Sequence, residues 1–352
     1  MGIFEALEAA GHEQLIFCQH QPTGLRALVA IHDTTLGPAL GGCRLWSYPD
    51  EKSAIADALR LAESSTYQMA TANTDAGGGM AVLLAADDEG ADEAALRAFG
   101  RFIDSLGGRF VAYSDLGTDD DNIRSVGRET AHVRASSPGE IDSETACAWG
   151  VFHGITAALN YVHNNAEVAG RTIALQGVGG VGSALARILV DQGAELILSD
   201  LRFDPVKELQ DRQPDTRMVR PDEIYDVDCD VFCPCAVGGV LNTERVERLK
   251  AKIVAGSAFN VLIDEALAAR LAERGILFVP EFIINAGDTL MHIHPGGRTE
   301  LDEVRKGTQR VYRMLGRVFN RCRRSGETPL AAAKALAREK IARIGLTKSI
   351  RR

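Results

Sequence analysis

The sequence predicts an α/β protein of two domains, and three observations lead to this prediction. The chain has 352 residues, enough for two domains of ordinary size that each bury a core. From Thr145 onward, helical stretches alternate with short apolar stretches, the pattern of a parallel sheet covered by helices on both faces. The character of the sequence changes near Pro138. We therefore expect an N-terminal α/β domain over residues 1–138 and a parallel-sheet domain over residues 139–324, with helices of residues 325–352 packing back on the first domain.

In the N-terminal domain, residues 53–70 place apolar side chains at helical spacing, so we expect an amphipathic helix there. This helix leads into residues 66–83, TYQMATANTDAGGGMAVL, which we interpret as a polar, glycine-rich loop at the helix end. A second helix is expected over residues 93–108, where two glycines close it. The strand-like residues 109–114 follow and lead to Asp115.

In the second domain we expect the alternation to begin with a helix over residues 145–162. A strand, a glycine turn, a helix and a second strand then fill the stretch from Arg171 to Asp200. Further short apolar strands are expected at 230–235, 252–257 and 277–282, and C-terminal helices at 301–326 and 329–344.

The composition indicates a soluble globular protein. Hydrophobic residues make up 45% and charged residues 25%, and no apolar run approaches the ~20 residues of a membrane span. The acidic, amphipathic N-terminus is unlike a signal peptide, so we expect the cytoplasm. A net charge of -9 and a pI near 5.5 argue against nucleic-acid or anionic-membrane partners.

The cysteines do not form a disulfide pattern. There are seven, an odd number at irregular spacings, which a reducing compartment explains better than a disulfide framework does. Cys229, Cys233 and Cys235 could suggest a metal site. We interpret them instead as small apolar residues of a buried strand and the turn after it, and we expect no metal.

A dinucleotide-binding motif stands in the second domain. Gly177, Gly179 and Gly182 form G-x-G-x-x-G directly after an apolar strand and at the start of a helix. Glycine permits a tight turn and close approach of a pyrophosphate, whose charge the backbone N–H groups of the helix start meet. Asp200 ends the next strand, where a carboxylate accepts from the ribose hydroxyls of NAD and repels the extra phosphate of NADP. The sequence therefore predicts a Rossmann domain that binds NAD, with Arg202 as the residue that could reverse this preference.

Seven ordered blocks carry a family resemblance. They are GPALGGCRLW, TYQMA with GGGMAV, SDLGT, GVGGVG, CPCAVGGVLN, AGSAFNVL and PEFIINAG. In order and spacing they resemble the leucine, phenylalanine and valine dehydrogenases of the glutamate dehydrogenase-like superfamily, over nearly the whole chain. The resemblance implies an N-terminal substrate and oligomerisation domain, a Rossmann NAD-binding domain, and a cleft between them. It also implies a small-molecule substrate and a homo-oligomer, a dimer or higher.

The sequence differs from the family at two positions whose side chains bind the substrate or act in catalysis. In that family the glycine-rich loop holds two lysines, one binding the substrate carboxylate and one acting in acid–base catalysis. The matching residues here are Gln68 and Met80. Gln68 can donate a hydrogen bond but supplies no charge, and Met80 cannot shuttle a proton. The chain is thus expected to be a divergent member lacking both active-site lysines.

Other positions match the family's site residues. Asp115 corresponds to the catalytic aspartate, although it could be only a helix cap. Asn260 corresponds to the asparagine near substrate and nicotinamide, although it could be only a turn residue. The substrate side is further expected to include Leu40, Gly41, Gly42, Gln68, Met80, Tyr113, Asp288, Thr289 and His292. The cofactor side is expected to include Thr145, Gly177, Gly179, Gly180, Val181, Gly182, Asp200, Arg202, Cys235, Ala236, Asn260 and Asn285.

The altered pocket favours a polar ligand. Tyr113 stands where the branched-chain enzymes have a small residue, and Asp288, Thr289 and His292 enter a segment that is mostly apolar in them. His292 and His294 lack a third placed ligand, so a metal is not expected.

Three hypotheses remain. The first is an NAD-dependent oxidoreductase redirected to an amine, imine, alcohol or decorated amino acid, with Asp115, and His292 or Tyr113 as further candidates, moving the proton. The second is a catalytically inactive NAD-binding regulator, and the third is a conventional leucine-type dehydrogenase. We favour the first, because decay of function would be expected to erode Asp115 as well.

Overall fold

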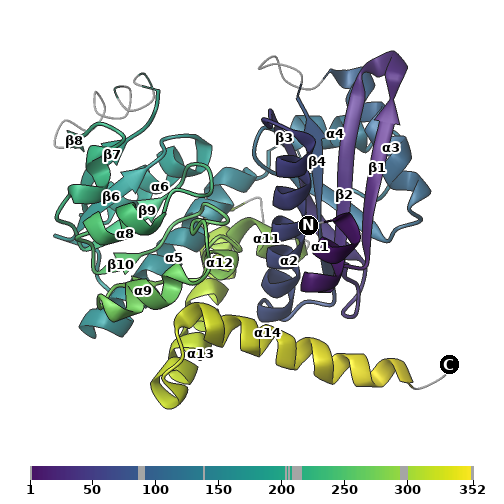
Figure 1. The fold of residues 1–352 in the computed structure, drawn as a ribbon. Coiled ribbons are helices and arrows are strands. Elements are labelled where there is room, and N and C mark those ends of the chain that lie inside the picture. Colours follow the sequence, from purple (N-terminus) through teal and green to yellow (C-terminus); the bar gives the residue numbers. More distant parts are fainter. Residues whose placement is uncertain are drawn as a thin grey trace. The chain divides into compact units, whose positions relative to one another are not determined.

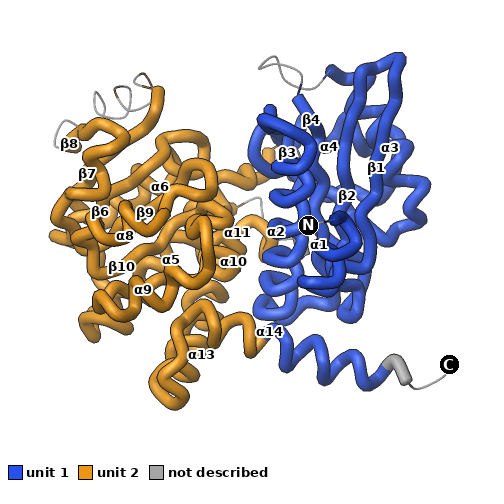
Figure 2. The backbone as a smooth tube through the Cα atoms, viewed as in Figure 1, with its two compact units in different colours: residues 1–138, 337–352 blue, residues 139–336 orange. Residues whose placement is uncertain are grey.

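The computed structural model describes residues 2–85, 92–137, 139–202, 204, 207, 216–293 and 300–349. Two compact units divide the chain: Met1–Pro138 with Ala337–Arg352, and Gly139–Leu336 (Figure 2). No helix among the described residues is both long and apolar enough to cross a membrane.

The first unit contains a five-stranded sheet in the order β1-β2-β4-β3-β5 (Figure 1). The strands are β1 Gln14–His20, β2 Leu25–Asp33, β3 Ala39–Trp46, β4 Gly77–Leu84 and β5 Phe110–Ser114. β2 pairs antiparallel with β1 and β4, whereas β3 pairs parallel with β4 and β5. The sheet is therefore mixed, and its parallel half contains the glycines and the strand end expected at the substrate site.

Helices cover the two faces of this sheet. The long helix α2 (Glu51–Thr71) begins where the Asp50 side chain accepts from the backbone N–H of Ser53, 2.7 Å away. α3 (Glu93–Ser105) and α4 (Asp120–Val126) bury Phe99 and Ile123 against the strands of the other face. Two further elements are α1 Ile3–Ala10 and the 3-10 turn Gln21–Thr23.

The stretch interpreted as a loop, residues 66–83, is mostly regular structure, so that interpretation was wrong. Residues 66–71 complete α2 and residues 77–83 belong to β4. The glycines that suggested a loop are there because helix and strand approach closely. A Cβ on Gly78 would collide with the backbone of Thr66 in α2, and one on Gly79 would lie 2.8 Å from the carbonyl oxygen of Ala30.

The second unit contains a six-stranded sheet in the order β11-β10-β9-β6-β7-β8, and all of its pairs are parallel. The strands are β6 Thr172–Gln176, β7 Glu195–Ser199, β8 Arg217–Met218, β9 Val231–Pro234, β10 Ile253–Val254 and β11 Leu277–Phe278. The predicted parallel sheet of the second domain is confirmed. β6 lies inside the sheet, with β7 and β8 following on one side and β9, β10 and β11 on the other. In such sheets ligands bind at the carboxyl ends of the strands where the order changes sides, so the carboxyl end of β6 is the expected ligand position.

Helices of the second unit lie before, between and after these strands. They are α5 Ser143–His163, α6 Gly180–Asp191, α8 Thr243–Arg248, α9 Leu267–Glu273, α10 Glu281–Ile284, α11 Gly287–Ile293, α12 Leu301–Thr308 and α13 Arg310–Ser325, with a 3-10 turn at Glu223–Asp226. α5 packs closely on α10 and α11, because a Cβ on Gly150 would lie only 2.7 Å from the Cα of Gly287.

The C-terminal helices differ from the expectation at residues 308–310, and residues 325–336 cluster with the second unit and not with the first. Residues 301–326 were expected to form one helix, but α12 ends at Thr308 and α13 begins at Arg310. The Thr308 hydroxyl donates to the carbonyl of Val304 at 2.8 Å and to that of Arg305 at 3.1 Å, the type of bond that bends a helix. α14 (Pro329–Gly345) and the 3-10 turn Leu346–Ser349 complete the chain. In the first unit, Arg338 donates to the Tyr67 hydroxyl at 2.9 Å and Lys340 to the Thr74 carbonyl at 2.9 Å.

Candidate active site

The substrate half predicted from the sequence lies on β3 of the first unit. A Cβ on Gly41 would lie 2.9 Å from the Phe110 ring, and one on Gly42 would lie 2.6 Å from the Cβ of Asp115. Gly42 pairs with Tyr113 of β5, whose side chain is buried. Glycine at these positions lets neighbouring groups come within contact distance of the β3 backbone.

Gln68 and Met80 are both buried, with 1% and 4% of their surface exposed. Met80 lies on β4, and continuing the register that pairs Leu40 with Gly78 places it opposite Gly42. On α2, the Ser65 hydroxyl donates to the carbonyl of Leu40 at 2.8 Å, and Gln68 follows three residues later on that side of the helix. Leu40, Gly42, Gln68 and Met80 are thus brought to one region of the first unit.

Asp115 lies just beyond β5 and forms a part-buried ion pair with Arg44. Arg44 Nε donates to its Oδ2 at 2.8 Å, with 12% and 16% of the two side chains exposed. The backbone N–H of Asp115 donates to the Thr118 hydroxyl oxygen at 3.0 Å. Oδ1 accepts no hydrogen bond from a described residue and lies 3.5 Å from the position of a Cβ on Gly42. The carboxylate is therefore held on one oxygen and available on the other.

Arg44 also binds a second carboxylate. Its Nη1 donates to Asp57 Oδ2 at 2.9 Å, and the Tyr48 hydroxyl donates to the same oxygen at 2.6 Å. Burial alone would lower the pKa of Arg44, but the charges of Asp115 and Asp57 outweigh it and raise that pKa well above its ordinary value. Burial and then the bond to Asp57 raise the pKa of Tyr48 as well. Arg44 thus stays cationic and fixes both carboxylates.

This network was not predicted from the sequence. Arg44 lies in the quoted block GPALGGCRLW, but its partner Asp115 is 71 positions away. The available signal was that Arg44 and Asp115 both lie near the carboxyl ends of strands, which adjoin in a parallel sheet.

The dinucleotide turn has the geometry that its motif predicts. Gly177 follows β6 with φ +97°, and a Cβ there would lie 2.7 Å from the backbone nitrogen of Ala236. A Cβ on Gly182 would collide with the carbonyl oxygen of Gly177, so α6 packs directly on the turn. Apart from its own chain neighbours, no atom of the described residues lies within 4 Å of a Cβ on Gly179, which leaves open space at the helix start. Gly177 thus serves the tight turn and Gly182 the close packing, and the space at Gly179 is where the motif predicts that a ligand would approach.

The start of α6 is suited to an anion. Gly180 and Val181 begin this 12-residue helix, whose first backbone N–H groups lack intrahelical acceptors. The exposed Glu144 side chain places its carboxyl group against Gly180. This carboxylate stands where the phosphates of a dinucleotide would be bound. Thr145 follows on α5, its N–H donating to the Asp142 carboxylate at 2.6 Å.

Asp200 follows β7 and braces the turn. Its Oδ2 accepts from the N–H of Val178 at 2.7 Å, and its Oδ1 accepts from the N–H of Arg202 at 2.8 Å. Each carboxylate oxygen keeps a further lone pair for a ribose hydroxyl. The Arg202 residue is exposed.

Asn260 has two features of a functional residue. Its backbone is left-handed, with φ 51°, and its Nδ2 is buried without a hydrogen-bond partner among the described residues. Cys235 and Ala236 directly follow β9; Cys235 is half-buried and Ala236 is exposed. Asn285 is buried, and its Nδ2 donates to the carbonyl of Ser257 at 3.2 Å.

The remaining predicted pocket residues belong to the second unit. Asp288 and Thr289 are buried in α11. His292 belongs to the same helix, and His294 falls outside the described residues. No group of three or more potential metal ligands occurs in the part of the chain that the structure describes.

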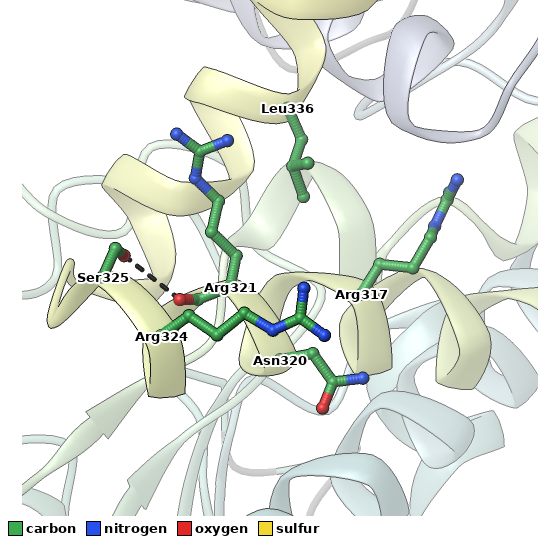
Figure 3. Close-up of a pocket in the computed structure, with 6 residues that line it drawn as sticks. All are labelled: Arg317, Asn320, Arg321, Arg324, Ser325 and Leu336. Carbon is green, nitrogen blue, oxygen red and sulfur yellow. Dashed lines mark hydrogen bonds between the residues drawn. The ribbon is translucent and has the colours of Figure 1, made fainter.

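A hollow of about 480 Å³ lies elsewhere in the second unit, between α13 and α14 (Figure 3). It is lined by Arg317, Asn320, Arg321, Arg324, Ser325 and Leu336. Arg321 is paired with Glu327 at 2.8 Å. None of the residues predicted from the sequence lines this hollow, so we do not assign the active site to it.

Comparison with known proteins decides the family. Residues 12–132 match the model of the Glu/Leu/Phe/Val dehydrogenase dimerisation domain. Residues 198–291 match that of glutamate/leucine/phenylalanine/valine dehydrogenase. The chain belongs to the Glu/Leu/Phe/Val dehydrogenase family. This confirms the resemblance inferred from the sequence.

Relatives of this family match along the whole chain. Leucine dehydrogenase from Thermoactinomyces intermedius is 39% identical over 99% of this chain and 96% of its own length. L-tryptophan dehydrogenase from Nostoc punctiforme is 39% identical over 99% of both chains. The crystal structure of the latter enzyme superposes with a TM-score of 0.77 at 37% identity, covering 97% of this chain and 99% of that one.

A more distant structure supports the fold alone. Hetero-hexameric glutamate dehydrogenase from Thermus thermophilus superposes with a TM-score of 0.79 at 20% identity, over 99% of this chain and 96% of that one.

Membership of the Glu/Leu/Phe/Val dehydrogenase family makes the present chain an oxidoreductase with a nicotinamide cofactor. The open space at Gly179 and the buried Asn260 Nδ2, which has no hydrogen-bond partner among the described residues, fit such a cofactor. The Glu144 carboxylate against Gly180 would have to move away for a phosphate to bind at the start of α6.

Proposed function

We propose that this protein is an NAD-dependent oxidoreductase of the amino acid dehydrogenase type whose substrate is more polar than a plain aliphatic amino acid. One observation carries the proposal. Gln68 and Met80, at the positions of the two family lysines, are buried in the first unit beside the β3 glycines. A buried amide and thioether replace a charge and a titratable amine, so ordinary amino acid deamination lacks both groups.

No neighbouring lysine replaces them among the side chains that the structure describes in the first unit. Lys52 is exposed at the start of α2. Lys340 donates to the Thr74 carbonyl, at the turn between α2 and β4. Binding of a carboxylate therefore falls to uncharged donors such as the Gln68 amide and the backbone N–H groups near Gly41.

The retained proton acceptor is Asp115. Arg44 holds its Oδ2, and Oδ1 accepts no hydrogen bond from a described residue and lies 3.5 Å from the position of a Cβ on Gly42. In this proposal Oδ1 takes the proton from the substrate nitrogen or hydroxyl. Hydride transfer is the chemistry that a bound nicotinamide would supply. Tyr113 of the first unit and His292 of the second are the next candidates for the proton. Each unit carries polar groups at the positions predicted for the substrate side, Tyr113 in the first unit and Asp288 and Thr289 in the second.

Asp200 supports NAD as the preferred cofactor. Its carboxylate braces the turn at Val178 and keeps lone pairs for two ribose hydroxyls. A 2′-phosphate at this point would meet a negative charge. Gly177, Gly179, Gly180, Val181 and Gly182 would hold the pyrophosphate.

A conventional amino acid dehydrogenase is the second candidate, and the relatives favour it. They include leucine, tryptophan and phenylalanine dehydrogenases at 37–39% identity. Their similarity is equally consistent with ordinary amino acid substrates. An inactive NAD-binding regulator is less well supported, because it does not explain the retained Arg44–Asp115 pair.

We further propose a homo-oligomer assembled through the first unit, since residues 12–132 match a dimerisation domain.

All seven cysteines are free thiols, which supports a reducing compartment such as the cytoplasm.

A substrate screen tests the proposed function. The protein is assayed with NAD and NADH against amines, imines, alcohols and polar amino acids, alongside L-leucine, L-tryptophan and L-phenylalanine. We expect turnover of a polar or amine-type compound and negligible turnover of the three named amino acids. Family-like turnover of any of the three supports the conventional dehydrogenase instead, and NAD binding without turnover of any compound supports the regulator.

A further inference from the structure

Two cysteines form a close pair beside the dinucleotide turn. Cys233 is on β9 and Cys235 follows the strand, and their sulfur atoms lie 3.7 Å apart. Cys233 is fully buried and Cys235 is half-buried. Cys147 is the other half-buried cysteine, and the remaining four are buried. A reagent that reaches Cys235 therefore finds a second thiol directly behind it.

The backbone between the two cysteines permits a disulfide at the limit of its span. Cys233 and Pro234 belong to β9. At the strand rise of about 3.2–3.4 Å per residue, the Cα atoms of Cys233 and Cys235 are about 6.4–6.8 Å apart, at the upper end of the range of about 4.4–6.8 Å that disulfides span. The sulfur atoms, now 3.7 Å apart, need to approach to about 2.05 Å.

The two thiols differ in reactivity. The bond from Cys233, opposed by burial and assisted by Ser257, lowers the pKa of Cys235. The same bond and burial raise the pKa of Cys233. Cys235 is the less buried and more readily ionised thiol of the pair, and thiolates are the reactive form.

Cys235 is in contact with the turn that binds the cofactor. Its backbone N–H donates to the Gln176 carbonyl at 2.7 Å. A Cβ on Gly177 would lie 2.8 Å from the carbonyl carbon of Cys235, and one on Gly182 would lie 3.6 Å from its Cβ. Because the turn packs this closely, a displacement of Cys235 cannot be absorbed without moving the turn.

We propose that Cys233 and Cys235 are a redox-sensitive dithiol that an organic disulfide such as glutathione disulfide oxidises, and that oxidation weakens dinucleotide binding. The Cys235 thiolate attacks glutathione disulfide, forming a mixed disulfide and releasing one glutathione thiolate. The Cys233 thiol, losing its proton, then attacks the Cys235 sulfur, forms the internal disulfide and releases the second glutathione. The two cysteines are oxidised and one glutathione disulfide is reduced to two glutathiones. The effect on binding rests on the cofactor site of the proposed function.

The test treats the reduced full-length protein with glutathione disulfide, with and without saturating NAD, and follows peptide masses and NAD affinity. We expect the peptide containing both cysteines to lose two hydrogen atoms, and bound NAD to slow this reaction. The oxidised protein should bind NAD about tenfold more weakly or worse, since one strong bond to the pyrophosphate is worth that much. Dithiothreitol should restore the affinity.

Two variants make the result specific. Cys233→Ala should stop at a stable glutathione adduct on Cys235, whereas Cys147→Ala should still form the internal disulfide. Absence of the disulfide in the wild-type protein overturns the proposal, as does a disulfide that leaves NAD affinity unchanged. If the reduced protein does not bind NAD at all, the proposed cofactor and the coupling to it fail, while the masses still decide whether the dithiol is oxidised.

Discussion

The substitution Asp115→Asn distinguishes two roles of Asp115, that of a proton acceptor and that of a structural carboxylate. The amide keeps the shape of the side chain and can still accept from Arg44, but it cannot take a proton. Loss of general acid–base catalysis costs about 10²-fold or more in turnover. We therefore expect turnover of the true substrate to fall by about 10²-fold or more, with NAD affinity unchanged.

The structure also sets the effect on stability. A hydrogen bond to a charged group contributes about 1.5–3 kcal/mol. Arg44 retains Asp57 at 2.9 Å, so its charge is not left unpaired when Asp115 becomes neutral. We expect the free energy of unfolding to fall by only about 1.5 kcal/mol, the lower end of that range. Denaturant unfolding measures this loss, and steady-state kinetics with the compound found in the screen measures turnover.

Asp57→Asn is the matched control. It removes a carboxylate from the same Arg44, and Tyr48 loses its charged acceptor too, so the stability loss should be at least as large. Turnover should fall far less than in Asp115→Asn, because the acceptor Oδ1 remains. Equal losses of turnover in the two variants would refute a direct role for Asp115 and show that both carboxylates act only by holding Arg44. Unchanged turnover in Asp115→Asn would show that another group accepts the proton.

Three further predictions address the cofactor and the substrate. Calorimetric titration should show tighter binding of NAD than of NADP, because we assign the ribose hydroxyls to the Asp200 carboxylate, which would repel a 2′-phosphate. Equal affinities would contradict this role. L-leucine, L-valine and L-phenylalanine should give negligible NADH. Gln68 cannot make the charge-assisted bond to the substrate carboxylate, worth about 1.5–3 kcal/mol, and Met80 cannot provide acid–base catalysis, worth about 10²–10⁴-fold in rate. Family-like rates would contradict the proposed function. Gly182→Ala should lower the free energy of unfolding by about 1–3 kcal/mol, because its Cβ would meet the Gly177 carbonyl, whereas Gly179→Ala should keep stability and weaken NAD binding. Unfolding and binding measurements on this pair test it, and the opposite pattern would reverse the two roles.

The sequence predicted the second unit better than the first. Alternation of strands and helices and the glycine motif are local signals, and the parallel sheet and the turn after β6 follow them. In the first unit, the glycines at 77–79 suggested a loop, yet they form part of β4. Their cause is the approach of α2 and β2, which no local pattern reveals.

The same reason explains the missed part of the candidate site. Arg44, Asp57 and Asp115 are each unremarkable as single residues, and their contacts span 13 and 71 positions. Gln68 and Met80 could be found because the resemblance fixed their positions. A charge network of this kind becomes visible only when the strands that carry it are paired.

The crowded glycines of the first unit also restrict how this enzyme can change over generations. Gly41, Gly78 and Gly79 touch backbone atoms or the Phe110 ring, so even a methyl group there has no room. Natural selection for a new substrate cannot reshape the pocket through them without disturbing the sheet. Substitutions that leave the sheet intact are expected instead at positions with a side chain to exchange, such as Gln68 and Met80, the two positions at which we propose a departure from the family lysines.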